Sequence, residues 1–397
     1  MLRLVPGLRS GSMSVPVSKS HAHRVLIAEF LAGRTACLAA ADGDCDDIAA
    51  TKRCLEELAR FRGREGRERR ERRETGLPHV PPDAHAPHVV SLDCGESGTT
   101  RRLLGPVVAA LGVKPNWIMK GRLASRPQID YADLRPGVQE LAGNVSSQFV
   151  SGLLFALPLL GGDSEIRLSS PLASRGYVAM TLGVLRTYGV RAEETATGFC
   201  VPGSQRFIAP GERPSFEADW SGAAFPLALK ALGNAVEIDA ASAAGLRGDS
   251  LQPDRVVGAL LARLAQKDGE VELDVDECPD LFPVLTVVAA KRPGATRFAG
   301  IRRLRLKESD RVAAMADVLA RFGVNVEVTD AAFVVHGVGA SALKGGAFRS
   351  LSDHRVAMSI AVGATVADAP VEIDDASCAA KSYPGFFEQF NGLRPTR

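Results

Sequence analysis

The sequence has few aromatic residues, almost no excess of either charge and no long hydrophobic run. Only 6% of its 397 residues are aromatic, and 48 Lys and Arg against 46 Asp and Glu give a formal net charge of +2. A chain so balanced has no global field that would favour nucleic acid or an acidic membrane surface. No stretch reaches about 18 uninterrupted apolar residues, and the first residues lack the apolar core of a signal peptide. We therefore expect a cytoplasmic protein, neither secreted nor membrane-spanning.

Cysteine is also scarce and irregularly spaced. The seven cysteines form no CxxC pair and no Cys/His cluster at the spacing of a zinc site. An odd number without such spacing fits reduced thiols better than a disulfide framework or a metal site. We therefore expect no metal site built from cysteines.

The length indicates more than one domain. A chain of 397 residues is too long for one compact core, and 46% hydrophobic against 24% charged residues is the balance of a soluble globular protein. We expect two domains of ordinary size.

What the chain has in abundance is helix starts rich in hydroxyl and cationic side chains. Ser18-Lys19-Ser20, with Arg24, opens an apolar run, and a helix start presents unpaired N–H groups and the positive end of the helix dipole. Taken singly, such a start is an ordinary Ser-capped helix. Several that converge would form a pocket for a small molecule with more than one anionic group. Similar starts occur at 96–102, 145–148, 219–222, 307–311 and 353–355.

Helical and strand patterns alternate along the chain, which predicts an α/β fold with short strands and mixed sheets. We expect helices at 19–31, 46–58, 98–111, 147–160, 219–232, 254–264, 279–290, 309–321 and 353–367. We expect strands at 36–40, 89–93, 117–119, 164–168, 236–238, 271–275, 333–335 and 371–373.

One stretch of pattern occurs twice. Residues 176–193 and 310–327 each read as a helix closed by an aromatic residue and glycine and followed by a strand, with nearly constant spacing. Such an echo in the two halves predicts two domains built from related α/β units.

Residues 60–88 lack any periodicity. The run at 62–73 alternates Arg and Glu without aromatics, and four prolines follow before residue 88. An RNA-binding arm would need aromatic or strongly basic character, so we interpret the run as a solvated loop or helix that the protein does not need for activity.

In this order the motifs resemble those of the 5-enolpyruvylshikimate-3-phosphate synthase family of enolpyruvyl transferases. They span residues 18–384, and any one of them is weak whereas the ordered set is specific. The residues that carry the resemblance are Ser18-Lys19-Ser20 with Arg24, Gly98-Thr99 with Arg102, Arg126-Pro127, Val145 to Phe149, Ser174 with Tyr177, Asp219, Pro279-Asp280, Lys307 to Arg311, Asp353-His354-Arg355, and Lys381 to Pro384.

The resemblance implies a two-domain α/β architecture of repeated βαβαββ units, an inside-out α/β barrel. It places an N-terminal domain at 16–217, on the shikimate 3-phosphate side, and a C-terminal domain at 1–15 plus 218–397, with the substrate cleft between them. It also implies a monomer with small-molecule substrates, no metal or organic cofactor, and no nucleic-acid or membrane partner.

The implied reaction condenses shikimate 3-phosphate with phosphoenolpyruvate and releases phosphate, a transferase step of the shikimate pathway that leads to chorismate and the aromatic amino acids. By resemblance the catalytic residues are Lys19, Asp280 and Glu308, with Glu308 as acid and Asp280 as base. Residues implied for shikimate 3-phosphate are Lys19, Ser20, Arg24, Ser146, Ser147, Gln148, Ser174, Tyr177, Asp280 and Lys307. Residues implied for phosphoenolpyruvate are Lys19, Gly98, Arg102, Arg126, Gln148, Arg311, Arg355 and Lys381.

The chain departs from the family pattern in four places. Val17 stands where many members have Gly, and Glu96 and Arg303 stand where Asn is common. Only residues 128–142 lie between Arg126-Pro127 and Gly143, so one unit is expected to be short.

Three alternatives stay open at this point. One is an enolpyruvyl transferase for another alcohol, although the reactive cysteine of the UDP-N-acetylglucosamine homologue has no counterpart at 121–125. Another is a non-catalytic anion-binding homologue, which the short unit favours. The third is an RNA-binding relative, which the near-neutral charge disfavours.

Overall fold

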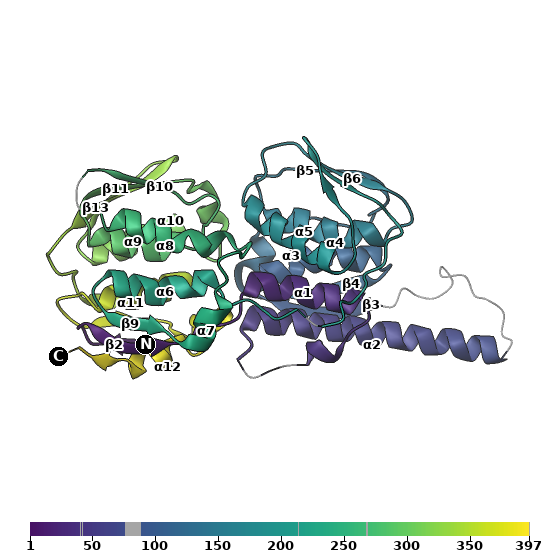
Figure 1. Cartoon of the computed structure of the whole chain (residues 1–397), viewed down its shortest axis with the longest axis horizontal. Coiled ribbons are helices and arrows are strands. Elements are labelled where there is room, and N and C mark those ends of the chain that lie inside the picture. Colours follow the sequence, from purple (N-terminus) through teal and green to yellow (C-terminus); the bar gives the residue numbers. More distant parts are fainter. Residues whose placement is uncertain (40, 42, 76–88, 213, 267–268, 397) are drawn as a thin grey trace. The chain divides into compact units, whose positions relative to one another are not determined.

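The computed structural model divides the chain into two compact units, drawn in Figure 1. Residues 20–215 form the central unit, and residues 1–19 with 216–397 form the terminal unit. The structure describes residues 1–39, 41, 43–75, 89–212, 214–266 and 269–396. No helix in these described ranges is long and apolar enough to cross a membrane.

A complete βαβαββ motif occurs in the central unit. Its sheet has the order β5-β6-β8-β7, in which β5 and β6 are parallel and the other neighbours antiparallel. Helix α4 follows β5 and helix α5 follows β6, so both helices start at the same edge of the sheet. The elements are β5 (Gly137–Leu141), α4 (Ser147–Ala156), β6 (Ser164–Leu168), α5 (Arg175–Thr187), β7 (Glu193–Glu194) and β8 (Gly198–Val201), with the 3-10 turn η4 (Leu157–Leu159) after α4.

The other sheet of the central unit is reduced to two parallel strands. Helix α3 connects them, and the 3-10 turn η3 follows the second strand before the chain enters β5. This βαβ remnant is the short unit expected from the 128–142 segment. The elements are α1 (Lys19–Leu31), α2 (Asp46–Thr75), β3 (Val89–Gly95), α3 (Gly98–Ala110), β4 (Lys114–Met119) and η3 (Gly121–Ser125).

Two sequence predictions in this region were wrong. The expected strand at 36–40 is a 3-10 turn, η1 (Ala36–Leu38), because an apolar run this short has no period that separates a strand from a helical turn. The helix expected to end at Leu58 continues to Thr75. Arg and Glu are good helix formers, and Arg60 pairs with both Glu56 and Glu57 one turn earlier, so the charged sequence extends the helix. The proline-rich remainder, 76–88, lies outside the described residues.

The terminal unit repeats the complete motif. Its four-stranded sheet has the order β10-β11-β13-β12 with the same parallel and antiparallel pairings. The predicted echo is confirmed: α5 and α10 are each followed by a glycine at positive φ, Gly189 at 73° and Gly323 at 77°, before the next strand. The elements are β10 (Val271–Asp274), α9 (Phe282–Ala290), β11 (Pro293–Ala299), η6 (Arg302–Leu306), α10 (Arg311–Arg321), β12 (Asn325–Val328) and β13 (Ala332–Val338).

Two three-stranded sheets complete the terminal unit, in the orders β1-β15-β14 and β16-β2-β9. The first strands of the chain therefore pair with strands from its second half. The elements are β1 (Leu2–Leu4), β2 (Arg9–Met13), α6 (Trp220–Ala231), β9 (Ala235–Ile238), α7 (Ala240–Gly245), η5 (Pro253–Val256), α8 (Val257–Leu264), β14 (Gly346–Phe348), α11 (His354–Ala364), β15 (Val371–Ile373), η7 (Ser377–Lys381), α12 (Phe386–Gly392) and β16 (Arg394–Pro395).

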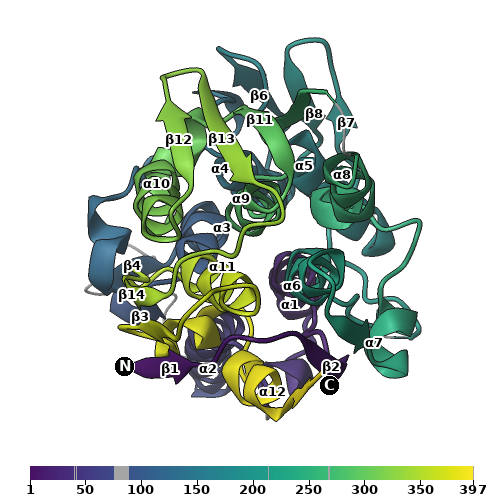
Figure 2. The ribbon, with the colours of Figure 1, turned by 90° about the vertical axis from the view of Figure 1, so that its left-hand side faces the viewer.

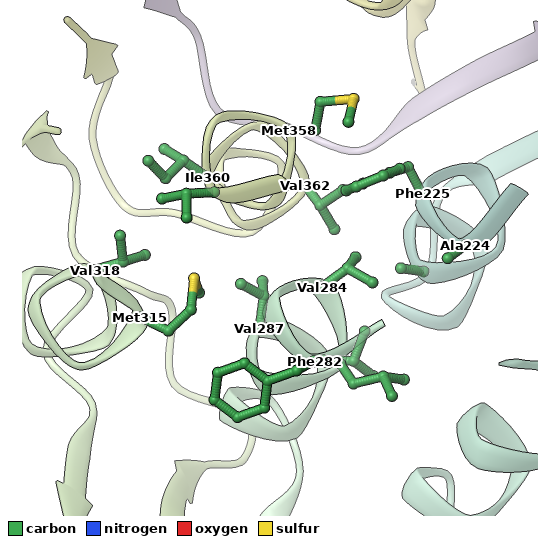
Figure 3. Close-up of a cluster of buried hydrophobic side chains, with 14 of the residues drawn as sticks. Ala224, Phe225, Phe282, Val284, Val287, Met315, Val318, Met358, Ile360 and Val362 are labelled. Carbon is green, nitrogen blue, oxygen red and sulfur yellow. The ribbon is translucent and has the colours of Figure 1, made fainter. Parts of the chain in front are cut away.

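The core of the terminal unit lies among four helices. Figures 1 and 2 show α6, α9, α10 and α11 between the four-stranded sheet and the sheets that contain β1 and β2. In Figure 3, Phe225 of α6, Val287 of α9, Met315 of α10 and Val362 of α11 point toward one another, and all four are fully buried. Burial of a large apolar side chain contributes about 1.5–3 kcal/mol. This packing fixes the ends of the helices, where the polar residues of the next section lie.

Substitution by alanine at two glycines should change the stability of the protein in opposite directions. Gly63 lies in the exposed part of α2, and no atom lies within 4 Å of the place that an alanine methyl would take, so Gly63→Ala should raise the free energy of unfolding by about 0.5–1 kcal/mol. A methyl at Gly152 of α4 would lie 2.4 Å from the carbonyl oxygen of Arg102 on α3. Gly152→Ala should therefore lower the free energy of unfolding by about 1–3 kcal/mol. Urea unfolding of both variants measures the difference, and equal effects would contradict the close approach of α3 and α4.

Candidate active site

The most concentrated polar cluster of the terminal unit surrounds Arg311, the first residue of α10. Its guanidinium is 1% exposed and donates to three carboxylates. Nη1 lies 2.7 Å from Asp280 Oδ1, Nη2 lies 3.0 Å from Glu308 Oε2, and Nε lies 2.9 Å from Asp353 Oδ2. The planar fork of an arginine fixes the direction of each bond, so this one side chain orients all three carboxylates.

Helix caps hold the cluster in place. Asp310 caps α10 by accepting from the backbone N–H groups of Val312 and Ala313. Asp353 caps α11 through Oδ1, which accepts from the Arg355 backbone 2.9 Å away, and its Oδ2 accepts from Arg311 and from the Ser309 hydroxyl. The cap that starts α11 is thus also the buried counter-ion of Arg311.

Asp280 lies among three cations. Besides Arg311, Lys307 Nζ is 3.7 Å from Oδ1 and Arg355 Nη2 is 3.7 Å from Oδ2. Burial alone would raise the pKa of Asp280, but Lys307, Arg311 and Arg355 together hold the pKa well below its usual value. Burial also lowers the pKa of Lys307 to about 8, against the opposing pull of Asp280. Asp280 is therefore ionised in the unliganded site, and Lys307 titrates near neutral pH.

Three further predicted residues lie in the terminal unit. His354 is buried at the first position of α11, and burial, with Lys19 and Arg355, lowers its pKa well below 6.5, so the ring is neutral. Neither of its ring nitrogens has a hydrogen-bond partner among the described residues. Lys19 starts α1, and Lys381 is the buried last residue of η7, which packs against α11.

In the central unit, Arg24 of α1 is buried, and its acceptors among the described residues are all neutral. Its Nε donates to Thr181 Oγ1 at 2.7 Å, Nη1 to the Ser20 carbonyl at 2.6 Å and Nη2 to Ser151 Oγ at 3.2 Å. Thr181 in turn donates to Ser151 and lies over the Tyr177 carbonyl. Burial lowers the pKa of Arg24 to about 10 because no carboxylate compensates its charge in this network. A guanidinium so placed is suited to an anionic ligand.

A second network of the central unit joins α3 to α4. Gln148 accepts from Arg102 Nη1 at 2.8 Å and donates to Thr99 Oγ1 at 2.8 Å. The Arg126 guanidinium lies against the start of α3, where a side-chain carbon at Gly98 would be 3.1 Å from Nη1. Glycine at position 98 therefore leaves room for the Arg126 guanidinium at the start of α3.

The predicted serines lie at the starts of α4 and α5. Ser146 caps α4 through the Gln148 N–H, Ser147 is its buried first residue, and Ser174 precedes α5. Ser174 has φ of 52°, a left-handed conformation that non-glycine residues adopt at some cost in energy and that is typical of functional sites. Tyr177 follows in the first turn of α5, and its N–H donates to the Ser174 carbonyl. The hydroxyls and N–H groups of two helix starts at one sheet edge suit a phosphate.

The three residues at which the chain departs from the family pattern each contact nearby residues. Glu96 lies over Gly121, whose φ is 53° and whose Cβ position the carboxylate would occupy. Arg303 Nε donates to Asp276 Oδ1 at 3.1 Å, so its charge is paired. Val17 is 38% exposed and forms an isolated bridge with Ala218.

Each of the two units contains part of the predicted residues. The predicted phosphoenolpyruvate residues are divided between them, with Gly98, Arg102, Arg126 and Gln148 in the central unit and Lys19, Arg311, Arg355 and Lys381 in the terminal unit. Sequence reasoning missed Asp353, Ser151 and Thr181 as partners of the buried arginines; only Asp353 had a signal, as a helix cap before Arg355. In the described ranges, no group of three or more His, Cys, Asp or Glu side chains is arranged to hold a metal ion.

Comparison with known proteins gives one consistent family. The model of the family described as EPSP synthase (3-phosphoshikimate 1-carboxyvinyltransferase) matches residues 7–127 and 121–390. A relative from Clostridium kluyveri, named 3-phosphoshikimate 1-carboxyvinyltransferase, is 33% identical over 433 aligned positions that cover 98% of this chain and 96% of the relative.

Solved structures show the same fold. The EPSP synthase of Acinetobacter baumannii superposes with a TM-score of 0.68 at 21% identity, covering 99% of this chain and 98% of that one. The enolpyruvyl transferase NikO of Streptomyces tendae superposes with a TM-score of 0.62 at 15% identity, covering 98% and 96%. The expected two-domain enolpyruvyl transferase architecture is thus confirmed.

Removing one carboxylate from Arg311 should destabilise the terminal unit. Asp353→Asn leaves part of a buried cation uncompensated and should lower the free energy of unfolding by about 3 kcal/mol. The control is Asp317→Asn, which breaks an exposed ion pair with Arg321 at 2.7 Å. This variant should change the free energy of unfolding by less than about 0.5 kcal/mol. Urea unfolding compares the two, and similar losses would show that the Asp353 pair contributes no more than a surface pair.

Proposed function

The chain belongs to the EPSP synthase family, and we propose that it transfers the enolpyruvyl group of phosphoenolpyruvate to the 5-hydroxyl of shikimate 3-phosphate, with release of phosphate. One arrangement supports this activity more than any other: Arg311 holds two carboxylates, Asp280 and Glu308, beside the cations Lys307 and Arg355. Acid and base groups at the edge of an anion-binding cluster are what the addition of an alcohol to a phosphorylated enol requires.

Shikimate 3-phosphate carries a phosphate and a carboxylate. The starts of α4 and α5, with Ser146, Ser147 and Ser174, would hold its phosphate, because their hydroxyls and N–H groups are oriented donors. The buried, uncompensated Arg24 favours an anionic or strongly polar group beside it. The full set proposed for this substrate is Lys19, Ser20, Arg24, Ser146, Ser147, Gln148, Ser174, Tyr177, Asp280 and Lys307.

Phosphoenolpyruvate is smaller than shikimate 3-phosphate and carries the same two kinds of anionic group, so it would be held mainly by cations. Each charge-assisted hydrogen bond contributes about 1.5–3 kcal/mol, so several are needed to compensate for desolvation of a phosphate and a carboxylate. Flanking guanidinium groups would also stabilise the charge that develops on the departing phosphate. The proposed set is Lys19, Gly98, Arg102, Arg126, Gln148, Arg311, Arg355 and Lys381.

The chemistry needs one proton delivered and one removed. Glu308 would protonate the methylene carbon of phosphoenolpyruvate while the 5-hydroxyl attacks C2 and Asp280 takes the hydroxyl proton, with Lys19 as a second proton carrier. The tetrahedral intermediate then expels phosphate and loses one proton of its new methyl group, which Glu308 would take back, so that the double bond is restored. In the free site Asp280 is a weak base because three cations lower its pKa. Bound anions would offset the positive charge of those cations and so raise the pKa of Asp280. Substrate binding would therefore make Asp280 a stronger base.

Phosphate release is the direct test. Purified protein is mixed with phosphoenolpyruvate and shikimate 3-phosphate, with each omitted in turn, and the organic product is identified by mass spectrometry. Release that requires both substrates supports the proposal. Release with another alcohol in place of shikimate 3-phosphate, or binding without release, would contradict it in favour of a different transferase or an anion-binding homologue.

Glu308→Gln should lower kcat by about 10²–10⁴-fold while the KM values for both substrates change only severalfold, because the amide cannot deliver a proton but keeps the shape of the side chain. Steady-state phosphate release measures both parameters. The matched control is Glu327→Gln on the exposed β12, whose carboxylate pairs with His336 of the neighbouring strand, and this change should leave kcat unaltered. A kcat within threefold of wild type in Glu308→Gln would remove this residue from proton transfer.

The titration of Lys307 predicts a pH dependence. Its pKa of about 8 lies below the ordinary 10.5, so its positive charge is present below pH 8 and is lost as the pH rises through that value. If Lys307 helps to bind shikimate 3-phosphate, kcat/KM for that substrate should fall about tenfold between pH 8 and pH 9.5. Lys307→Arg, which stays charged throughout, should flatten this limb. An unchanged limb in the variant would assign the titration to another group.

A further inference from the structure

The guanidinium of Arg355 is held by Ser221, which lies 134 positions earlier in the chain. Its guanidinium is 1% exposed, with Nη1 donating to the Ser221 carbonyl at 2.8 Å and Nη2 to Ser221 Oγ at 2.5 Å. Ser221 is in the first turn of α6, and Arg355 is in the first turn of α11. Two bonds to one residue fix both the position and the plane of the guanidinium.

The Ser221 hydroxyl is itself fixed. Asp219 caps α6, and its Oδ1 accepts from the Ser221 N–H at 3.1 Å and from the Ser221 hydroxyl at 2.8 Å. Because the only hydroxyl hydrogen is directed to Asp219, the oxygen presents its lone pairs to Arg355. Asp219 is 5% exposed, and its N–H donates to the Pro16 carbonyl at 2.9 Å, so the whole support is anchored.

Ser221 and Asp280 both lie near the same nitrogen of Arg355. Arg355 Nη2 is 2.5 Å from Ser221 Oγ and 3.7 Å from Asp280 Oδ2. An arginine free of Ser221 would shorten its contact with Asp280, the closest carboxylate that the structure gives it. The bonds to Ser221 use two of the five guanidinium N–H groups, and Nε has no hydrogen-bond partner among the described residues.

We propose that Ser221, oriented by Asp219, is a positioning residue that holds Arg355 away from Asp280 so that its remaining N–H groups bind phosphoenolpyruvate. The inference deepens the proposed function and rests on it. Ser221 touches no substrate in this scheme. It keeps Arg355 available to phosphoenolpyruvate, and it keeps Asp280, which already pairs with Arg311 at 2.7 Å, from a second tight ion pair that would weaken it further as a base.

Helix α7 offers a matched control for the cap. Asp239 caps α7 as Asp219 caps α6, accepting from the Ser242 N–H at 2.8 Å and the Ser242 hydroxyl at 3.2 Å. Ser242 Oγ accepts from the Val15 N–H at 2.8 Å, in place of an arginine. Ser242→Ala therefore removes a similar buried hydroxyl from the same unit without touching a cationic group.

The test compares Ser221→Ala with Ser242→Ala. Loss of a hydrogen bond to a charged group should raise KM for phosphoenolpyruvate about ten- to a hundredfold in Ser221→Ala, with a smaller fall in kcat and an unchanged KM for shikimate 3-phosphate. Ser242→Ala should leave kcat and the KM values for both substrates within twofold of the wild-type values. Unfolding in urea should be similar for the two variants. A Ser221→Ala enzyme with wild-type KM for phosphoenolpyruvate would overturn the inference.

A double-mutant cycle with Arg355→Lys separates positioning from general damage. If Ser221 acts through the guanidinium, Ser221→Ala in the Arg355→Lys background should lower kcat/KM for phosphoenolpyruvate by less than twofold further. An equal loss in both backgrounds would show that Ser221 supports the site in another way and would refute the inference while wild-type turnover upholds the proposed function. Absence of wild-type turnover would instead overturn the proposed function and the inference with it.

Discussion

The terminal unit depends on one buried guanidinium shared by three carboxylates. Arg311 contacts Asp280, Glu308 and Asp353 at 2.7–3.0 Å, so its single charge must compensate for more than one anion. The imbalance is corrected by Lys307 and Arg355 around Asp280. A buried network of this kind stabilises only when every member is satisfied, which ties folding of the unit to the geometry of its acid and base groups.

Repetition explains how such networks are built. In both complete βαβαββ motifs the parallel strand pair brings two helix starts to one edge of the sheet, and these starts carry the serines of α4 and α5 and the charged residues before α10. Each start supplies N–H groups and a cap, so a cation or hydroxyl placed there is held by backbone geometry. The same construction serves two purposes: hydroxyls and one uncompensated arginine in the central unit, and paired acids and bases in the terminal unit.

Much of this could be predicted from the sequence because it is local. The helix-Gly-strand echo, the caps and most helix and strand positions follow from periodicity and turn residues, and the ordered motifs identify the family. The expected strand at 36–40 and helix end at Leu58 failed where apolar periodicity was absent and local propensity decided. Partners such as Ser221 for Arg355 and Thr181 for Arg24 could not be predicted, because they lie more than a hundred positions away and only tertiary packing brings them together.

The same logic explains why a shortened unit is compatible with the proposed site. In the complete motifs, the antiparallel strands β7, β8, β12 and β13 carry none of the proposed substrate or catalytic residues. The reduced unit keeps the first of the two helix starts, with strand β3, the turn to Gly98 and helix α3 with Arg102, and has the 3-10 turn η3 before Arg126 where the complete motifs have a second helix. Arg126 still lies against Gly98, and Gln148 still joins Arg102 to Thr99. The described part of the reduced unit thus lacks the two antiparallel strands, which carry no proposed residue in the complete motifs, and it keeps Gly98, Arg102 and Arg126, which the proposed chemistry uses.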